Sequence, residues 1–178
     1  PDSSKFWLLV DNLDSDIDHT YQYWVVDLEP LENSPELVKT ADPYSHLVLS
    51  PFDDPWIPEN SYPNLPIYPE GQEREVTLFN LSSNDYNWQV ENFEKPKKED
   101  LIIYEVLIRD FDSERTFQNL IDKIDYFKNL NINAIELMPV MEFEGNESWG
   151  YNTAFHMAVD KFYGPENKLK EFIDLCHQ

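Results

Sequence analysis

Two apolar runs separated by an amphipathic stretch constrain the fold of this chain more than any other feature. Residues 101–109 and 134–140 are nearly continuous apolar runs, as in strands that are buried on both faces. Between them, residues 117–127 carry apolar side chains at spacings of three and four, which predicts a helix with Thr116 as its N-cap. Asn131 tolerates the left-handed backbone that ends a helix. This order predicts parallel strands joined by a right-handed crossover.

A second helix is predicted after the second strand. Gly164 and Pro165 would open it, and its apolar stripe consists of Leu169, Phe172, Ile173 and Cys176. Cys176 is the only cysteine, so no internal disulfide can form, and its place in the stripe predicts a small core residue. The resulting βαβα unit could begin either a doubly wound sheet or a barrel, and periodicity does not choose between them.

Three motifs in this region favour the barrel. They are Tyr104-Glu105-x-x-Ile108-Arg109-Asp110-Phe111, then Ile132-Asn133-Ala134-Ile135-Glu136-Leu137-Met138-Pro139-Val140, then Trp149-Gly150-Tyr151-Asn152 followed by Val159-Asp160-x-x-Tyr163-Gly164. In order and spacing they resemble the first strand, the second strand and the following segment of the catalytic barrel in the α-amylase superfamily of glycoside hydrolases. Leu107 and Asn131 depart from the pattern, since many relatives carry His and Gly there. Leu107 weakens the likeness to branching enzymes more than the likeness to the superfamily.

The first part of the chain has a different pattern. Residues 6–13 and 20–27 partly alternate as strands do, whereas residues 29–40 have the composition of a loop. Ala41-Asp42-Pro43-Tyr44 and Tyr86-Asn87-Trp88 resemble the immunoglobulin-like module that precedes the barrel in branching-type and debranching-type members. The expected fold class is therefore α/β plus β, with a partial immunoglobulin-like β-sandwich followed by the βαβα start of a TIM barrel.

Length limits how much of each unit this chain can hold. We predict a partial sandwich with a proline-rich strap over residues 1–98 and the first two βα units of a (β/α)8 barrel over residues 99–178. A complete barrel needs roughly 250 residues and a complete sandwich about seven strands, so we expect a fragment of a longer enzyme. Two open parallel strands would expose their edges, and we expect self-association through them.

The strap covers residues 51–69, which include six prolines. We expect it to pack the first module onto the barrel. The alternative is a glucan-binding platform, because exposed aromatic rings on a sandwich can stack on sugars. The aromatic residues in question are Trp56, Tyr62, Tyr68, Tyr86 and Trp88.

The resemblance implies a retaining mechanism that uses two carboxyl groups about 5 Å apart, supported by a third carboxylate. In the superfamily these lie on the fourth, fifth and seventh barrel strands, which would follow Gln178. We therefore assign no catalytic residue. Glu105 and Glu136, on the two predicted strands, are expected to pair with Arg109 or with backbone donors in a polar interior.

The loop after the second strand is expected to carry substrate-binding residues. The resemblance implies that the Tyr151 ring stacks on the sugar at the cleavage subsite, where an aromatic face meets the C–H face of a pyranose. Trp149 would line the same pocket and Asn152 would supply a hydrogen bond, and the alternative for each is a role in packing the core or the loop. Glu142 and Glu144 lie in the same loop, and we expect solvated charges there, with contact to the substrate as the alternative. The four histidines, His156 among them, have no metal-ligand spacing, so we expect neither a metal nor a cofactor.

The net charge of the chain excludes some classes of binding partner. The formal net charge is −22, from 35 acidic and 13 basic residues, which argues against nucleic acid and anionic membranes. A neutral α-glucan is compatible with it. Three functions stay open: a hydrolase of α-1,4- or α-1,6-linked glucans, a branching enzyme or other transglycosidase, and a non-catalytic glucan-binding or scaffold relative. Localisation is open too, with a secreted or periplasmic protein favoured over a cytoplasmic one.

Overall fold

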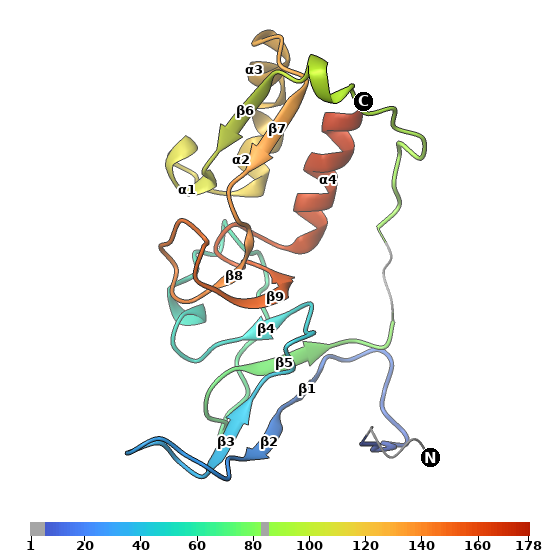
Figure 1. The fold of residues 1–178 in the computed structure, drawn as a ribbon. Coiled ribbons are helices and arrows are strands. Elements are labelled where there is room, and N and C mark those ends of the chain that lie inside the picture. The colour runs from blue at the N-terminus through green and yellow to red at the C-terminus, as the bar shows by residue number, and fades with distance from the viewer. Residues whose placement is uncertain (1–5, 83–85) are drawn as a thin grey trace.

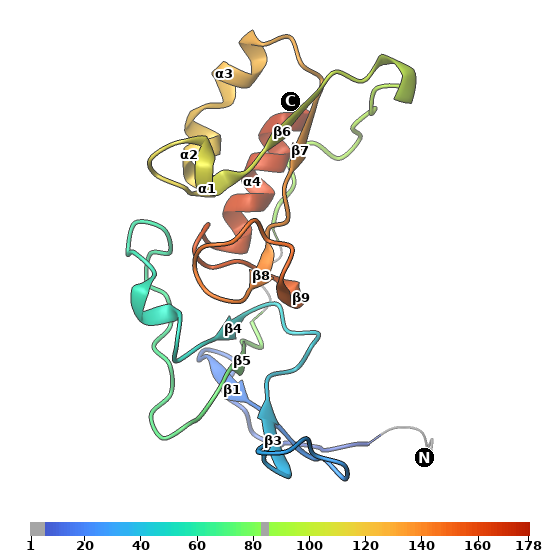
Figure 2. The ribbon, with the colours of Figure 1, turned by 60° about the vertical axis from the view of Figure 1, so that its left-hand side comes forward.

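The computed structural model describes residues 6–82 and 86–178. The N-terminal strands lie at one end of an elongated molecule, and a parallel strand pair with its helices lies at the other (Figure 1). A β-hairpin lies between these two parts in both ribbon views (Figure 2).

The predicted parallel pair is confirmed. Strand β6 (Ile103–Val106) pairs in parallel with β7 (Ala134–Leu137), and the register places Glu105 opposite Glu136. Both strands are shorter than predicted, and β6 ends where helix α1 (Ile108–Phe111) begins. The prediction of burial on both faces is wrong for these residues. Ile103 is 53% exposed, since helices cover only one face of the pair.

The first amphipathic stretch forms two helices instead of one. Helix α2 (Phe117–Asp122) and helix α3 (Ile124–Asn129) are separated at Lys123. The predicted N-cap is confirmed, because the Thr116 hydroxyl accepts the Asn119 backbone N–H at 3.1 Å. Asn131 has a φ of 54°, so the predicted left-handed turn is confirmed as well. The buried core of this part is lined by Val106, Ile108, Phe117, Leu120, Phe127, Tyr163 and Phe172.

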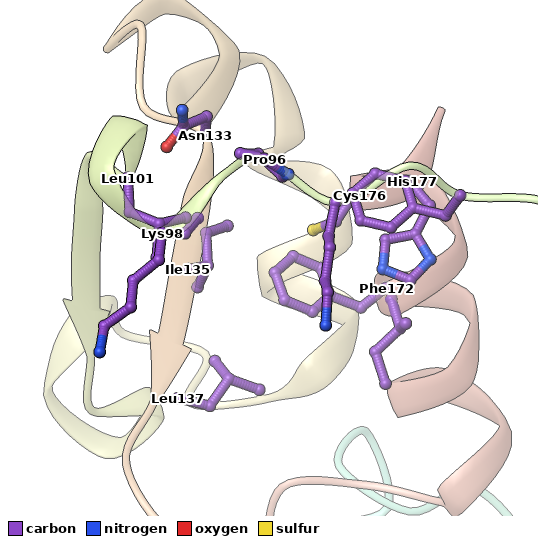
Figure 3. Close-up of a pocket in the computed structure, with 13 residues that line it drawn as sticks. Pro96, Lys98, Leu101, Asn133, Ile135, Leu137, Phe172, Cys176 and His177 are labelled. Carbon is purple, nitrogen blue, oxygen red and sulfur yellow. The ribbon is translucent and has the colours of Figure 1, made fainter.

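Helix α4 (Glu166–His177) covers β7 and packs against α2. Leu169 and Phe172 are buried as predicted, but Cys176 is exposed, so its prediction as a core residue is wrong. The last turn of α4 lies beside the outer edge of β7, where no further strand of the described residues covers it (Figure 3). Asp174 is instead buried on this helix, and its carboxylate accepts the backbone N–H groups of Gln89 and Val90 at 2.8 and 3.0 Å.

Short antiparallel strands make up the N-terminal part. Strands β1 (His19–Tyr21), β5 (Val76–Phe79) and β4 (Val48–Leu49) form one sheet in the order β1-β5-β4, and β2 (Tyr23–Val26) pairs with β3 (Leu37–Thr40). The predicted strand over residues 6–13 is wrong, because that segment pairs with no strand of the described residues. The predicted loop over residues 29–40 is wrong at its end, where β3 forms. This strand pairs with β2, a contact that the composition of residues 29–40 does not predict.

The strap contains one short 3-10 helix, η1 (Asp54–Trp56), and a second, η2 (Lys98–Asp100), precedes β6. Trp56 points into solvent, so it does not pack the strap onto the barrel part. The contacts of the strap with that part include polar contacts of Asp53 and Asp54, which belong to the site described next.

The β-hairpin consists of β8 (Met141–Phe143) and β9 (Thr153–Val159). It follows directly on the carboxyl end of β7, and the N-terminal part packs against it through Ala41, Val48, Phe155 and Ala158. The carboxyl ends of barrel strands are where active sites are built. The N-terminal part therefore lies against the segment that follows this end of the sheet.

Candidate functional site

All three predicted substrate-binding residues lie in one loop, residues 144–152, between β8 and β9. The loop is closed at its base, because Glu144 donates its backbone N–H to the Asn152 carbonyl at 3.3 Å. The Asn152 amide nitrogen donates back to the Glu144 carbonyl at 3.1 Å. Ser148 hydrogen-bonds the Asn152 side-chain oxygen and accepts the Gly150 backbone N–H at 3.0 Å. The Asn152 side chain thus braces the loop at both of its polar atoms.

Gly150 fixes the path of the loop next to Tyr151. Its φ of 88° lies in the region that L side chains rarely adopt. A Cβ built there would clash with the Pro139 carbonyl oxygen, so the backbone passes directly over the residues that follow β7. Only glycine satisfies both conditions, and it leaves the adjoining tyrosine on a defined backbone.

The two aromatic rings of the loop face solvent. Trp149 is 61% exposed and Tyr151 is 71% exposed. Neither ring is therefore buried in the core, and each is accessible to a ligand. The Tyr151 ring projects from a loop that is braced at its base, at Ser148 and at Gly150.

A buried ionic cluster lies under the hairpin. Lys161 is 1% exposed, and its ammonium group pairs with Glu142 and with Asp54 of the strap, the latter at 3.3 Å. The Glu142 carboxylate also accepts the Lys161 backbone N–H at 3.2 Å. The prediction of Glu142 as a solvated loop charge is therefore wrong. Burial raises the pKa of Glu142, while the positive charge of Lys161 opposes the shift.

Asp160 adds a third carboxylate to this cluster. It accepts the backbone N–H of Phe143 at 3.2 Å and that of Phe162 at 2.9 Å. Burial, followed by repulsion from the Glu142 carboxylate, raises the pKa of Asp160 to about 7. The sequence does not predict this cluster, because Asp54, Glu142 and the Asp160–Lys161 pair come from three separate segments of the chain.

The strand carboxylates Glu105 and Glu136 are exposed, so their predicted pairing in a polar interior is wrong. Arg109 pairs with Asp110 at 2.7 Å instead. Arg109 lies in α1, which begins after β6 has ended. It is therefore not on the strand that carries Glu105. Glu144 is exposed as predicted, and His156 is exposed on β9. Within residues 6–82 and 86–178, no cluster of three or more His, Cys, Asp or Glu side chains could hold a metal ion.

Two cavities differ in their relation to this loop. An apolar pocket of about 460 Å³ lies between β7, α4 and the segment before β6, and it shares no residue with the Tyr151 loop (Figure 3). A cleft of about 320 Å³ borders the loop, lined by Glu142, Glu144 and Asn152 on one side and by Ser50 and Asp53 on the other. The helices that the structure describes are all too short or too polar to cross a membrane.

Comparisons with known proteins agree on the second part of the chain. A family model described as the alpha amylase catalytic domain matches residues 78–178. Malto-oligosyltrehalose trehalohydrolase of Saccharolobus solfataricus is 40% identical over 98 residues, which are 55% of this chain and 18% of that enzyme. The 1,4-alpha-glucan branching enzyme of Halothermothrix orenii is 28% identical over 152 residues, which are 79% of this chain and 24% of that enzyme.

Two solved structures show the same likeness. A putative alpha amylase from Salmonella typhimurium matches with a TM-score of 0.54 and 30% identity, over 58% of this chain and 18% of that one. The catalytic module of the glycogen-degrading pneumococcal virulence factor SpuA matches with a TM-score of 0.58 and 22% identity, over 89% of this chain and 26% of that one. The chain spans only about a fifth of the length of the curated relatives named above.

Proposed function

Because this chain belongs to the α-amylase superfamily of glycoside hydrolases, we propose that the protein containing it cleaves α-1,4 or α-1,6 linkages in starch-like or glycogen-like glucans. The proposed mechanism is the retaining one, with a carboxylate nucleophile and a carboxyl acid/base. In this proposal residues 99–178 supply the first two βα units and part of the sugar-binding surface. The catalytic carboxylates come from later strands.

The exposed Tyr151 ring carries this proposal. It projects from a braced loop in the segment that follows the carboxyl end of β7, the end at which barrel enzymes bind substrate. An aromatic face packs well on the C–H face of a pyranose, and its electron-rich surface favours the positive charge that develops on the sugar in the transition state. Tyr151 therefore stacks on the sugar at the cleavage subsite.

The neighbouring residues have lesser roles in the proposal. Trp149 lines the same surface with its open ring face. Asn152 has one amide hydrogen left for a sugar hydroxyl, because its other polar contacts brace the loop. The proposal assigns the N-terminal strands and the strap to a partial immunoglobulin-like sandwich, and it expects self-association through the open outer edges of β6 and β7 only where the rest of the barrel does not cover them.

A branching enzyme is the second candidate. The similarity to the Halothermothrix orenii branching enzyme extends over 79% of this chain, so it includes the N-terminal part. Hydrolase and branching enzyme would share the Tyr151 platform and differ in whether water or a glucan hydroxyl accepts the cleaved chain.

The test is to assay the intact protein on amylose, amylopectin and pullulan, with Tyr151→Ala and Tyr151→Phe as variants. We expect Tyr151→Ala to lower kcat/KM about tenfold or more, which is about 1.4 kcal/mol or more of lost transition-state stabilisation, while Tyr151→Phe keeps most of the activity. Tyr44→Ala is the control, because Tyr44 is an equally exposed tyrosine of the N-terminal part.

The product identifies the reaction. Release of reducing ends supports the hydrolase, and chain transfer without net release supports the branching enzyme. No turnover on any glucan, or full activity of Tyr151→Ala, would refute the proposal.

A further inference from the structure

We propose that Asn146 is a positioning residue, through which the strap of the N-terminal part holds the Tyr151 loop in its productive geometry. This inference rests on the proposed function of Tyr151. It assigns the strap a role in catalysis that requires no contact between the strap and the glucan.

The first observation is a direct hydrogen bond between the strap and the loop. The Asn146 amide nitrogen donates to the Asp53 carbonyl at 2.9 Å, in a partly buried position. Asn146 lies inside the loop, five residues before Tyr151. The contact therefore ties the loop, beyond its own base, to a segment almost a hundred residues away in the sequence.

The second observation is that the acceptor is itself fixed. The Asp53 carbonyl also accepts the Trp56 backbone N–H at 3.0 Å, which closes the turn of η1. Ser50 donates its backbone N–H to the Asp54 carboxylate at 2.9 Å and its hydroxyl to the Asp53 carboxylate at 3.2 Å. A carbonyl held by its own turn presents its second lone pair to Asn146 in one direction.

The third observation is that the next strap residue reaches the other end of the hairpin. Asp54 pairs with Lys161, which follows β9 and also binds Glu142 at the centre of β8. Asp53 and Asp54 thus contact both the loop and the base of the same hairpin. The strap is anchored at the base by a buried charge, so the Asn146 contact is made from a fixed support.

A fourth contact also involves the loop. Glu147 pairs with Arg115 at 3.1 Å, and the two side chains are 69% and 42% exposed. Exposed ion pairs contribute little, so this contact alone would leave the loop free to move. The partly buried hydrogen bond of Asn146 is the stronger of the two and decides where the loop lies.

The experiment is a double-mutant cycle in the intact protein. We expect Asn146→Ala to lower kcat about 3- to 10-fold with little change in KM, and to raise hydrogen–deuterium exchange in residues 144–152. Asn146→Asp should behave like the alanine variant, because a carboxylate cannot donate to the Asp53 carbonyl. In a Tyr151→Ala background, Asn146→Ala should cost nothing further.

Asn60 provides the matched control. It lies on the same strap and donates a hydrogen bond at 3.3 Å to Glu114, which is not a residue of the loop. Asn60→Ala and Asn60→Asp should leave kcat and loop exchange unchanged.

Two outcomes overturn the inference while the proposed function stands. In the first, Tyr151→Ala loses activity but Asn146→Ala changes neither kcat nor hydrogen–deuterium exchange. In the second, the activity losses of Tyr151→Ala and Asn146→Ala multiply in the double variant. If Tyr151→Ala retains full activity, the proposed function fails, and the positioning role fails with it.

Discussion

Lys161→Met should destabilise the β8–β9 hairpin by about 3–5 kcal/mol at pH 7. The change keeps the length of the side chain but removes the cation that pairs with Glu142 and Asp54. Removing one partner of a buried ion pair leaves an uncompensated charge, which costs this much in other proteins. Lys161 is almost completely inaccessible to water, so solvent cannot take over the role of the ammonium group.

The magnitude can be bounded from the chemistry of Glu142. Its carboxyl has an ordinary pKa of 4.5, and each pH unit corresponds to about 1.36 kcal/mol. Protonating Glu142 at pH 7 therefore costs about 3.4 kcal/mol. This is the upper limit on what the unpaired Glu142 carboxylate can cost in the variant, because the carboxyl can take up a proton instead of staying charged. At pH 5 the same step costs about 0.7 kcal/mol. The difference between Lys161→Met and the native protein should therefore shrink by about 2–3 kcal/mol between pH 7 and pH 5.

The assay is hydrogen–deuterium exchange of residues 141–161 in the intact protein, which gives a free energy of opening for the hairpin itself. Lys123→Met is the control, since Lys123 pairs with Asp112 at 3.1 Å on the surface and should contribute less than about 1 kcal/mol. A loss below 1 kcal/mol at pH 7 for Lys161→Met, or an equal loss at both pH values, would refute the reasoning.

The other two predictions concern the same hairpin. The pKa of Asp160 is about 7 in the folded chain and 3.8 in an ordinary carboxyl, so the folded state holds the proton more tightly. The stability that this group contributes is therefore complete below about pH 4 and is lost as the pH rises through 7. Hairpin opening measured by exchange should therefore become easier from pH 5 to pH 8, and Asp160→Asn, which cannot titrate, should remove this slope; an unchanged slope in the variant would assign the titration to another group. Gly150→Ala should cost at least about 2 kcal/mol in loop stability and lower glucan turnover, because it adds a clash with Pro139 to the strain of a positive φ. Gly145→Ala in the same loop has a similar φ of 78° but open space around it, so it should cost about half as much, and equal losses would show that the Pro139 contact does not matter.

Local signals predicted the elements that local chemistry decides. Thr116 caps α2 because its hydroxyl reaches a backbone N–H three residues on. Asn131 ends the helical region in the left-handed conformation that its side chain tolerates. The parallel pairing of β6 with β7 follows from two apolar runs on either side of an amphipathic stretch. The site loop was found through the motif Trp149-Gly150-Tyr151-Asn152, whose glycine is needed for a close backbone approach.

Contacts between distant segments explain the failures. Residues 6–13 alternate as a strand does but pair with nothing in the described chain, and β3 forms in a segment with the composition of a loop because β2 lies beside it. Cys176 has the spacing of a core residue, yet the described residues provide no strand to cover it. Periodicity reports which face of an element is apolar and carries no information on whether a neighbour covers that face.

The sequence by itself determined the family, the parallel strand pair and the loop that carries Tyr151, since each depends on residues close together in the chain. Only the tertiary structure decided that Glu142 is a buried partner of Lys161, that Asp54 of the strap shares this lysine, and that Asn146 reaches the Asp53 carbonyl. The pKa of a carboxyl and the strength of its ion pair depend on burial and on charges within a few ångströms. Those neighbours come from segments far apart in the sequence, so they exist only once the chain has folded.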